Sequence, residues 1–132
     1  MGKKRILVIG GSAAGPKAAA KARRLDESAE IILLQKGADL SMASCGYPYY
    51  VGGYFDDRNM LLCTPAGVVR DPKFYVNAKA IDARTSTEAT AIDRKAKTVA
   101  YTNLASGETG TLPYDKLIIA TGASARMPPI PG

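Results

Sequence analysis

Three short apolar runs in this chain predict buried strands. They cover residues 4–9, 30–35 and 116–120, and each is closed by glycine or by polar residues. Continuous rather than alternating apolar residues are typical of strands that are buried on both faces, as in a parallel sheet. Residues 14–25 are rich in alanine and carry arginines toward their end, which predicts a helix. The beginning of the chain is therefore expected to form a strand–helix–strand unit with parallel strands.

Polar and apolar residues alternate in the second half of the chain. Strands are predicted near 80–84, 87–93, 97–103 and 109–113, and three antiparallel strands with polar outward faces form a β-meander. Residues 64–78 give only a weak helix pattern, which prolines and a glycine interrupt. The expected fold class is α/β, with a central parallel sheet plus an antiparallel three-stranded β-meander.

The composition narrows the class of protein. The chain has 132 residues, of which 46% are hydrophobic and 23% are charged, as in one ordinary globular domain. No run of apolar residues is long enough to cross a membrane, so no membrane partner is expected. The apolar run after the basic N-terminus is too short for a secretory signal, and we expect a cytoplasmic protein.

Charge and missing residue types narrow the chemistry. The net charge is +6 and no basic run exceeds three residues, so the pattern favours a phosphorylated small molecule over nucleic acid. The chain has no histidine, which excludes histidine-based general base catalysis. Most transition-metal sites need histidine as well, and no metal site is expected. Two cysteines, Cys45 and Cys63, are too few for a disulfide scaffold.

A glycine-rich turn lies between the first predicted strand and helix. Residues 10–15 follow the dinucleotide-binding pattern in part, because Gly10 and Gly15 are in place but Ser12 stands at the middle glycine. Backbone N–H groups at the start of such a helix can hold a pyrophosphate. At the end of the second strand, where an acidic residue usually binds a ribose diol, the chain carries Gln35. The amide of Gln35 can still bind a diol, but without a carboxylate's charge.

The loop at residues 41–53, SMASCGYPYYVGG, is the most specific segment. Together with the glycine turn and with residues 114–122, it resembles the single-cysteine branch of the flavin-dependent pyridine nucleotide–disulfide oxidoreductases. That branch contains coenzyme A (CoA) disulfide reductases, persulfide or polysulfide reductases, and NADH oxidases and peroxidases. The resemblance covers nearly the whole chain. It implies a Rossmann-like FAD-binding domain.

The resemblance also implies a catalytic role for Cys45. Electrons from NADH or NADPH would pass through FAD to the Cys45 sulfur, which cycles through a mixed disulfide with CoA, a persulfide or a sulfenic acid. Cys45 precedes a predicted short helix, whose N-terminus would favour the reactive thiolate. Tyr50 stands where two-cysteine reductases carry the second cysteine, and Cys63 is interpreted as structural. By the same resemblance the FAD-binding residues are Gly10, Gly11, Ser12, Ala13, Ala14, Gly15, Gln35, Lys36, Ser44, Ala89, Thr121 and Gly122.

The choice within the branch depends on two further comparisons. The continuation PYYVGG at residues 48–53 is closer to the CoA disulfide reductases than to the oxidases and peroxidases. Oxidases and peroxidases carry a histidine in the glycine turn where this chain has Ala13, which favours the CoA disulfide reductase side. On that side, basic residues of the first helix bind the phosphorylated end of CoA. The residues that match the CoA contacts of the family, on this helix and beyond it, are Lys17, Lys21, Arg24, Ser41, Ser44 and Lys79.

Relatives of this kind are several times longer than 132 residues. The resemblance therefore predicts that residues 1–125 are the N-terminal part of an FAD-binding domain. Residues 126–132 would be a linker toward an NAD(P)-binding domain, and the full-length enzyme would be a homodimer. This portion alone is expected to be inactive. Two alternatives stay open, an NADH oxidase of the same family and a non-catalytic nucleotide-binding fragment in which Cys45 is inert.

Overall fold

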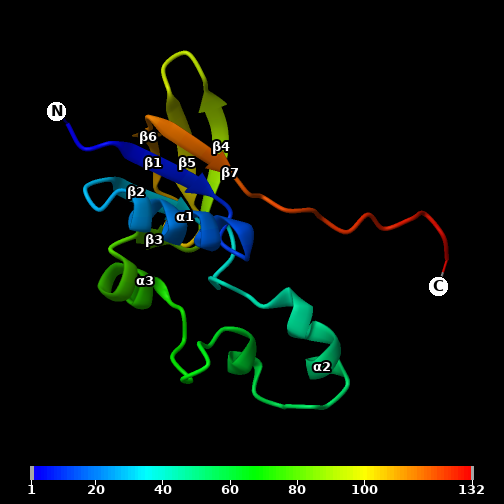
Figure 1. Cartoon of the computed structure of the whole chain (residues 1–132). Helices are drawn as coiled ribbons and strands as arrows, with labels where there is room; N and C mark the ends of the chain where they lie inside the picture. The colour runs from blue at the N-terminus through cyan, green and yellow to red at the C-terminus, as the bar shows by residue number, and fades with distance from the viewer. Residues whose placement is uncertain (1, 132) are drawn as a thin grey trace.

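The computed structural model describes residues 2–131 and arranges them around a parallel sheet (Figure 1). Along the chain, the strands and longer helices are β1 (Arg5–Ile9), α1 (Ala14–Leu25), β2 (Glu30–Leu34), α2 (Tyr47–Val51), α3 (Pro72–Lys79), β3 (Asp82–Arg84), β4 (Thr87–Asp93), β5 (Thr98–Asn103), β6 (Thr109–Pro113) and β7 (Lys116–Ile119). Two short 3-10 turns, η1 (Ser44–Gly46) and η2 (Arg58–Leu61), lie before and after α2. Within the described residues, no helix has the length and apolar character that a membrane crossing would need.

The parallel sheet has the strand order β3-β2-β1-β7. The first strand lies in its interior, where Val8 pairs with Leu33 on one side and with Ile118 on the other. A second sheet, β4-β5-β6, is an antiparallel meander. This arrangement confirms the α/β fold class with a parallel sheet and a separate three-stranded meander.

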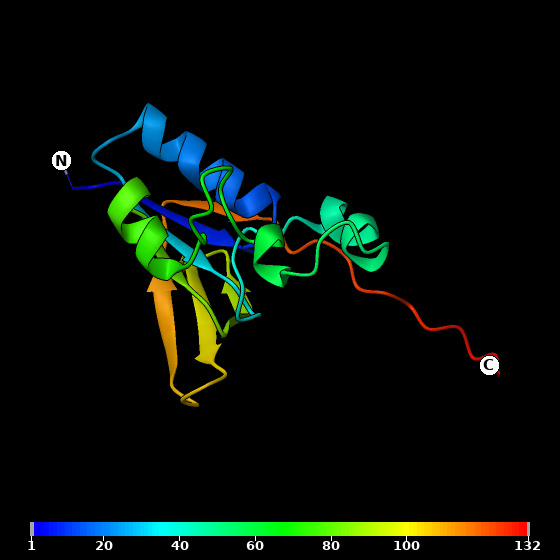
Figure 2. The same cartoon turned by 90° about the horizontal axis from the view of Figure 1, so that it is seen from below.

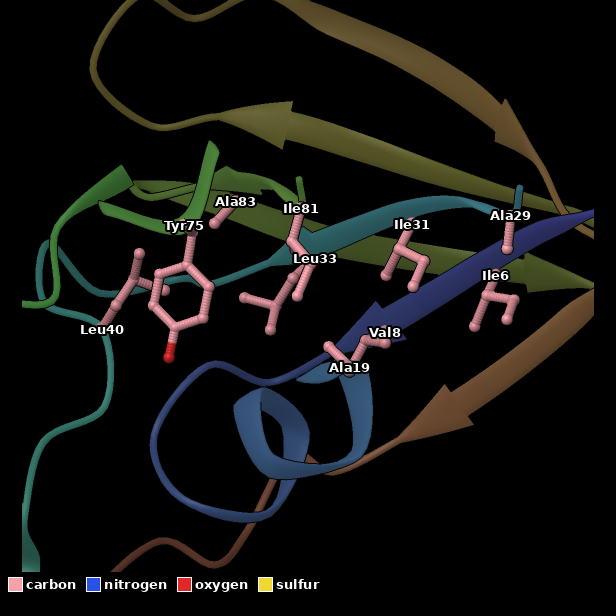
Figure 3. Packing of buried hydrophobic residues seen from close by; sticks show 10 residues of the cluster. All are labelled: Ile6, Val8, Ala19, Ala29, Ile31, Leu33, Leu40, Tyr75, Ile81 and Ala83. Carbon is pink, nitrogen blue, oxygen red and sulfur yellow. The ribbon is translucent and has the colours of Figure 1, made fainter. Parts of the chain in front are cut away.

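Both faces of the parallel sheet are buried, which explains its uninterrupted apolar runs. Successive side chains of a strand point to opposite faces. Ile6 and Val8 pack toward α1 and α3, whereas Leu7 and Ile9 pack against the meander, where Val99 is fully buried. Figure 2 shows α1 on one side of the sheet and the meander on the other. Figure 3 shows the core on the helical side.

The two longest helices begin differently. Helix α3 has a side-chain cap, because the carboxylate of Asp71 accepts the N–H of Phe74, and Pro72 occupies the first turn. Helix α1 follows Ala13, which cannot cap it, and has no acidic residue in its first turn. The first N–H groups of α1 therefore lack both a side-chain cap and a neighbouring carboxylate.

The turn after α1 is held by Asp26. Its carboxylate accepts the hydroxyl of Ser28 and the N–H groups of Ser28 and Ala29, which positions the start of β2. The hydrogen bond from the Ser28 side chain lowers the pKa of Asp26 below its ordinary value. The turn thus fixes the exit of α1 relative to the sheet.

Two predicted segments differ from the structure. The sequence predicts a weak helix over residues 64–78, but only 72–79 are helical, because Cys63 and Val69 form an isolated antiparallel bridge that closes the preceding turn. The strand predicted near 80–84 is shorter, and the sequence did not indicate its partner: β3 pairs with β2 at the edge of the parallel sheet. Other elements agree within one residue at each end.

Candidate functional site

The glycine turn lies at the carboxyl end of the parallel sheet. Gly10 has a φ of +108°, and a Cβ there would lie 2.0 Å from the carbonyl oxygen of Ala120. A Cβ on Gly15 would lie 1.8 Å from the carbonyl oxygen of Gly10. Only glycine fits both positions, so α1 starts directly against the end of β1. In open α/β sheets, ligands bind at this edge of the strands.

One cavity opens beside this turn, between the ends of β1 and β2 and the start of β4. It has a volume of about 240 Å³, and its lining residues are Ile9, Gly10, Leu34, Gln35, Lys36, Thr87, Glu88, Ala89 and Thr121. Lys36 and Glu88 form an ion pair of 2.8 Å across it. Five of the predicted FAD-binding residues thus share one cavity: Gly10, Gln35, Lys36, Ala89 and Thr121.

Gln35 makes hydrogen bonds that the sequence did not reveal. Its side-chain oxygen accepts the N–H of Gly11 at 2.8 Å, and its side-chain nitrogen donates to the carbonyl of Asp39 at 3.0 Å. Gly11 is buried, so this bond satisfies an N–H that water cannot reach. The first role of Gln35 is therefore to fix the glycine turn to the end of β2.

A second cavity, which we call the basic pocket, lies along α1. Its volume is about 440 Å³, and it is lined by Ser12, Ala13, Pro16, Lys17, Ala20, Arg24, Ser41, Met42, Ala43, Thr64, Arg70, Phe74, Tyr75 and Lys79. The lining contains four cationic side chains and no acidic one. None of the four makes an ion pair with any part of the chain that the structure describes. A polyanion is the ligand that such a lining favours.

The basic pocket brings together four of the six predicted CoA-binding residues, namely Lys17, Arg24, Ser41 and Lys79. Lys21 and Ser44 do not line it. Ser12 and Ala13, predicted to bind FAD, line the basic pocket instead of the smaller cavity. The remaining predicted FAD residues, Gly11, Ala14, Gly15, Ser44 and Gly122, line neither cavity.

Tyr75 and Arg70 are pocket residues that sequence reasoning missed. Tyr75 is 4% exposed, and its ring belongs to the core that Figure 3 shows. Its hydroxyl forms a short hydrogen bond with the hydroxyl of Ser41. Ser41 has a φ of +54°, so the chain is strained where this serine enters the pocket. The tyrosine thereby holds Ser41 in place from the core side.

We expect Tyr75→Phe to lower the free energy of unfolding by about 1 kcal/mol, because it removes one partly buried hydrogen bond. Urea denaturation measures the change. Tyr101→Phe is the matched control, since no hydrogen bond of the Tyr101 hydroxyl is seen among the described residues, and it should change stability by less than about 0.5 kcal/mol. Equal stabilities of the two variants would contradict the role given to the Tyr75 hydroxyl.

Cys45 lies in η1, directly before α2. Its side chain is exposed and free. The N–H of Ala43 donates to the carbonyl of Leu61 at 2.9 Å, and Gly46 lies so close to the Leu61 side chain that a Cβ would meet it at 2.6 Å. Contacts with η2 therefore hold the cysteine segment on both sides of Cys45. The short helix predicted after Cys45 is present, with five residues.

The aromatic residues after Cys45 remain largely on the surface. Tyr47, Tyr49, Tyr50 and Tyr54 are all at least 38% exposed, although Tyr49 and Tyr54 pack edge to face. Cys63 is half-buried at its bridge with Val69. Among residues 2–131, no group of histidine, cysteine or acidic side chains could hold a metal ion.

Comparison with known proteins gives a consistent result. Residues 4–132 match the family described as pyridine nucleotide-disulphide oxidoreductase. A CoA disulfide reductase of Staphylococcus epidermidis (strain RP62A) is 35% identical over 121 residues, which are 92% of this chain and 26% of that protein. The chain therefore spans about a quarter of the length of that curated relative.

Solved structures agree with the sequence matches. An NAD-dependent persulfide reductase from A. fulgidus superimposes with a TM-score of 0.91 at 45% identity, over 96% of this chain and 23% of its own. A water-forming NADH oxidase from Lactobacillus brevis has a TM-score of 0.85 at 26% identity, over 98% of this chain and 27% of its own.

Proposed function

The chain belongs to the pyridine nucleotide-disulphide oxidoreductase family, and from this premise we propose that it is part of an FAD-dependent disulfide reductase. Residues 1–125 would form the N-terminal part of the FAD-binding domain, and residues 126–132 the linker that follows. The proposed reaction is NAD(P)H-dependent reduction of CoA disulfide, a persulfide or a polysulfide through Cys45. A homodimer and a cytoplasmic location stay predictions.

The fit of FAD to this chain is supported by three observations. The start of α1 has no side-chain cap and no acidic first-turn residue, so its N–H groups suit a pyrophosphate. The glycine turn has no room for side chains at Gly10 and Gly15, so the start of α1 lies directly against the end of β1, where a pyrophosphate would bind. The cavity of about 240 Å³ beside the turn offers space for part of the adenosine. When bound, FAD supplies a path for two electrons between NAD(P)H and a disulfide.

The basic pocket fits the phosphorylated end of CoA. A diphosphate and a 3′-phosphate together carry a charge of about −4 near neutral pH, since the second pKa of a phosphomonoester is about 6. Four cations and no carboxylate line the pocket, and Ser41 adds a hydroxyl. Charge-assisted hydrogen bonds from these groups would hold the phosphates.

The observation that carries the proposal is the short chain distance between this pocket and the exposed thiol. Ala43 lines the basic pocket, and Cys45 follows two residues later. Two residues of extended chain span at most about 7 Å. A ligand whose phosphates occupy the pocket and whose sulfur lies at the end of a long arm could therefore reach Cys45. CoA has this form.

We expect the purified chain to retain flavin after it has been mixed with FAD and desalted, and its visible absorption spectrum is the measurement. Ala89→Phe should reduce the retained flavin, because the larger side chain fills the cavity beside the glycine turn. Ala91→Phe, on the exposed part of the same strand, is the matched control, and far-UV circular dichroism monitors folding. Equal retention of flavin by the wild type and by Ala89→Phe would contradict the placement of FAD in this cavity. Absence of flavin from the folded wild-type chain would mean either that this part of the domain is too incomplete to hold FAD or that the turn binds another ligand.

The NADH oxidase alternative is favoured by one observation, the structural similarity to the L. brevis enzyme. Against it stands Ala13, an exposed residue in the glycine turn where the resemblance predicts a histidine in oxidases and peroxidases. Oxygen consumption by the full-length protein that is unaffected by CoA thiols would support the oxidase instead.

A further inference from the structure

Arg70 is the one cation of the basic pocket that the predicted CoA-binding set does not contain. Lys17 and Arg24 lie on α1, whereas Arg70 lies just before α3. We propose that Arg70 is a further phosphate-binding residue, which faces the ligand from the wall of the pocket formed by residues 64–79. The inference rests on the proposed binding of CoA, and it adds a residue to that same site.

The backbone of Arg70 is fixed on both sides. Its N–H donates to the carbonyl of Leu62 at 3.1 Å, next to the bridge between Cys63 and Val69. The turn inside the bridge is closed by hydrogen bonds between Thr64 and Val68, in which the N–H of Thr64 donates to the carbonyl of Val68 and the N–H of Val68 donates to the hydroxyl of Thr64. Immediately after Arg70, Asp71 caps α3. Arg70 therefore lies between a closed turn and a capped helix, so its backbone needs little ordering when a ligand binds.

The carboxylates near Arg70 already have other partners. Asp71 accepts the N–H of Phe74 at 2.7 Å, and Asp57 accepts the N–H of Asn59 at 2.9 Å. Asp39 pairs with Arg58. In the described part of the chain, no acidic side chain lies within ion-pair distance of the Arg70 guanidinium. Its charge is thus available to a ligand.

The charge of the pocket also supports this role. Lys17, Arg24 and Lys79 supply three positive charges against about four negative charges on CoA, and Arg70 supplies the fourth. A guanidinium can also bind one phosphate through two parallel hydrogen bonds, which a lysine cannot do. The pocket would therefore hold the phosphates from α1 on one side and from Arg70 on the other.

The test is the affinity of the purified protein for CoA, measured by isothermal titration calorimetry. Arg70→Gln should raise the Kd about tenfold or more, as expected when a hydrogen bond to a charged group is lost. It should also reduce the dependence of the Kd on salt, because one fewer cation faces the phosphates. Titration with dephospho-CoA, which lacks the 3′-phosphate, identifies the phosphate that Arg70 binds. If Arg70→Gln loses affinity equally for CoA and dephospho-CoA, Arg70 binds the diphosphate. If it loses affinity for CoA alone, Arg70 binds the 3′-phosphate.

Arg94→Gln is the matched control, since it makes the same charge change in the turn between β4 and β5, outside the pocket. It should leave the Kd for CoA within about twofold of wild type, as for a surface charge far from the ligand. If the wild-type protein binds CoA and the Arg70→Gln protein binds it with the same Kd, the role of Arg70 is overturned. A wild-type protein that fails to bind CoA would instead overturn the proposed function itself.

Discussion

We expect Cys45→Ser to abolish the release of CoA from CoA disulfide that the proposed function assigns to the reduced protein. In the proposed function, the Cys45 thiolate would attack one sulfur of the disulfide, form a Cys45–CoA mixed disulfide and release the other CoA as a thiolate. This step is thiol–disulfide exchange and needs no added electron donor. A serine hydroxyl cannot replace the thiolate, so release should fall from about one CoA per chain to background. Thiol release and the mass of the adduct are the two measurements.

Cys63→Ser is the control for this experiment. Cys63 is half-buried beside Val69, whereas Cys45 is exposed, so the exchange should persist in the Cys63 variant. Unchanged release by the Cys45 variant, or loss of release in the Cys63 variant, would contradict the assignment of Cys45. An inert Cys45 in the wild-type protein would favour the non-catalytic nucleotide-binding alternative.

The second large effect is expected at the glycine turn. In Gly15→Ala, the new methyl group would lie 1.8 Å from the carbonyl oxygen of Gly10 and 3.2 Å from the Val8 side chain. This overlap can be relieved only if α1 shifts away from the sheet, because the closest atom is a backbone oxygen and not a flexible side chain. We expect the free energy of unfolding to fall by more than about 3 kcal/mol, as for severe overpacking. Urea denaturation followed by circular dichroism measures it.

Gly107→Ala is the control, because it replaces a glycine at a position where the added methyl group overlaps with no other atom. Gly107 has a φ of +75°, and no atom lies within 4 Å of the position that an added methyl group would take. Its replacement should cost only about 1–2 kcal/mol, because a residue with a Cβ adopts a left-handed conformation less readily than glycine. If both variants lose the same free energy of unfolding, steric overlap with Gly10 is not the reason why Gly15 must be glycine.

Much of the fold could be predicted because its core elements carry a strong local signal. The strands β1, β2 and β7 are formed by uninterrupted apolar runs, and α1 is bounded by the glycine turn. The placement of β3 could not be predicted in the same way. Its residues have the alternating pattern of a meander strand, but it pairs with β2, which is about fifty residues earlier in the chain.

Some of the predicted site residues, such as Gly10, Lys17 and Ser41, line a cavity in the structure, and their binding roles stay predictions. Arg70 and Tyr75 were missed because the bridge at Cys63 and the packing of α3 bring them to the pocket. Neither residue stands out locally in the sequence. Gln35 was identified by its position, but its hydrogen bonds to Gly11 and Asp39 depend on the folded loop.

The strand order has a consequence for how the chain folds. The first strand pairs on one side with β7, and the N–H of Arg5 donates to Asp115, 110 positions later. Contacts between such distant segments form slowly, because the chain must lose the entropy of closing a long loop before these contacts stabilise it. During synthesis, one edge of β1 therefore stays without its partner until β7 has emerged from the ribosome. In that interval, an apolar strand with unpaired backbone groups is open to association with other chains.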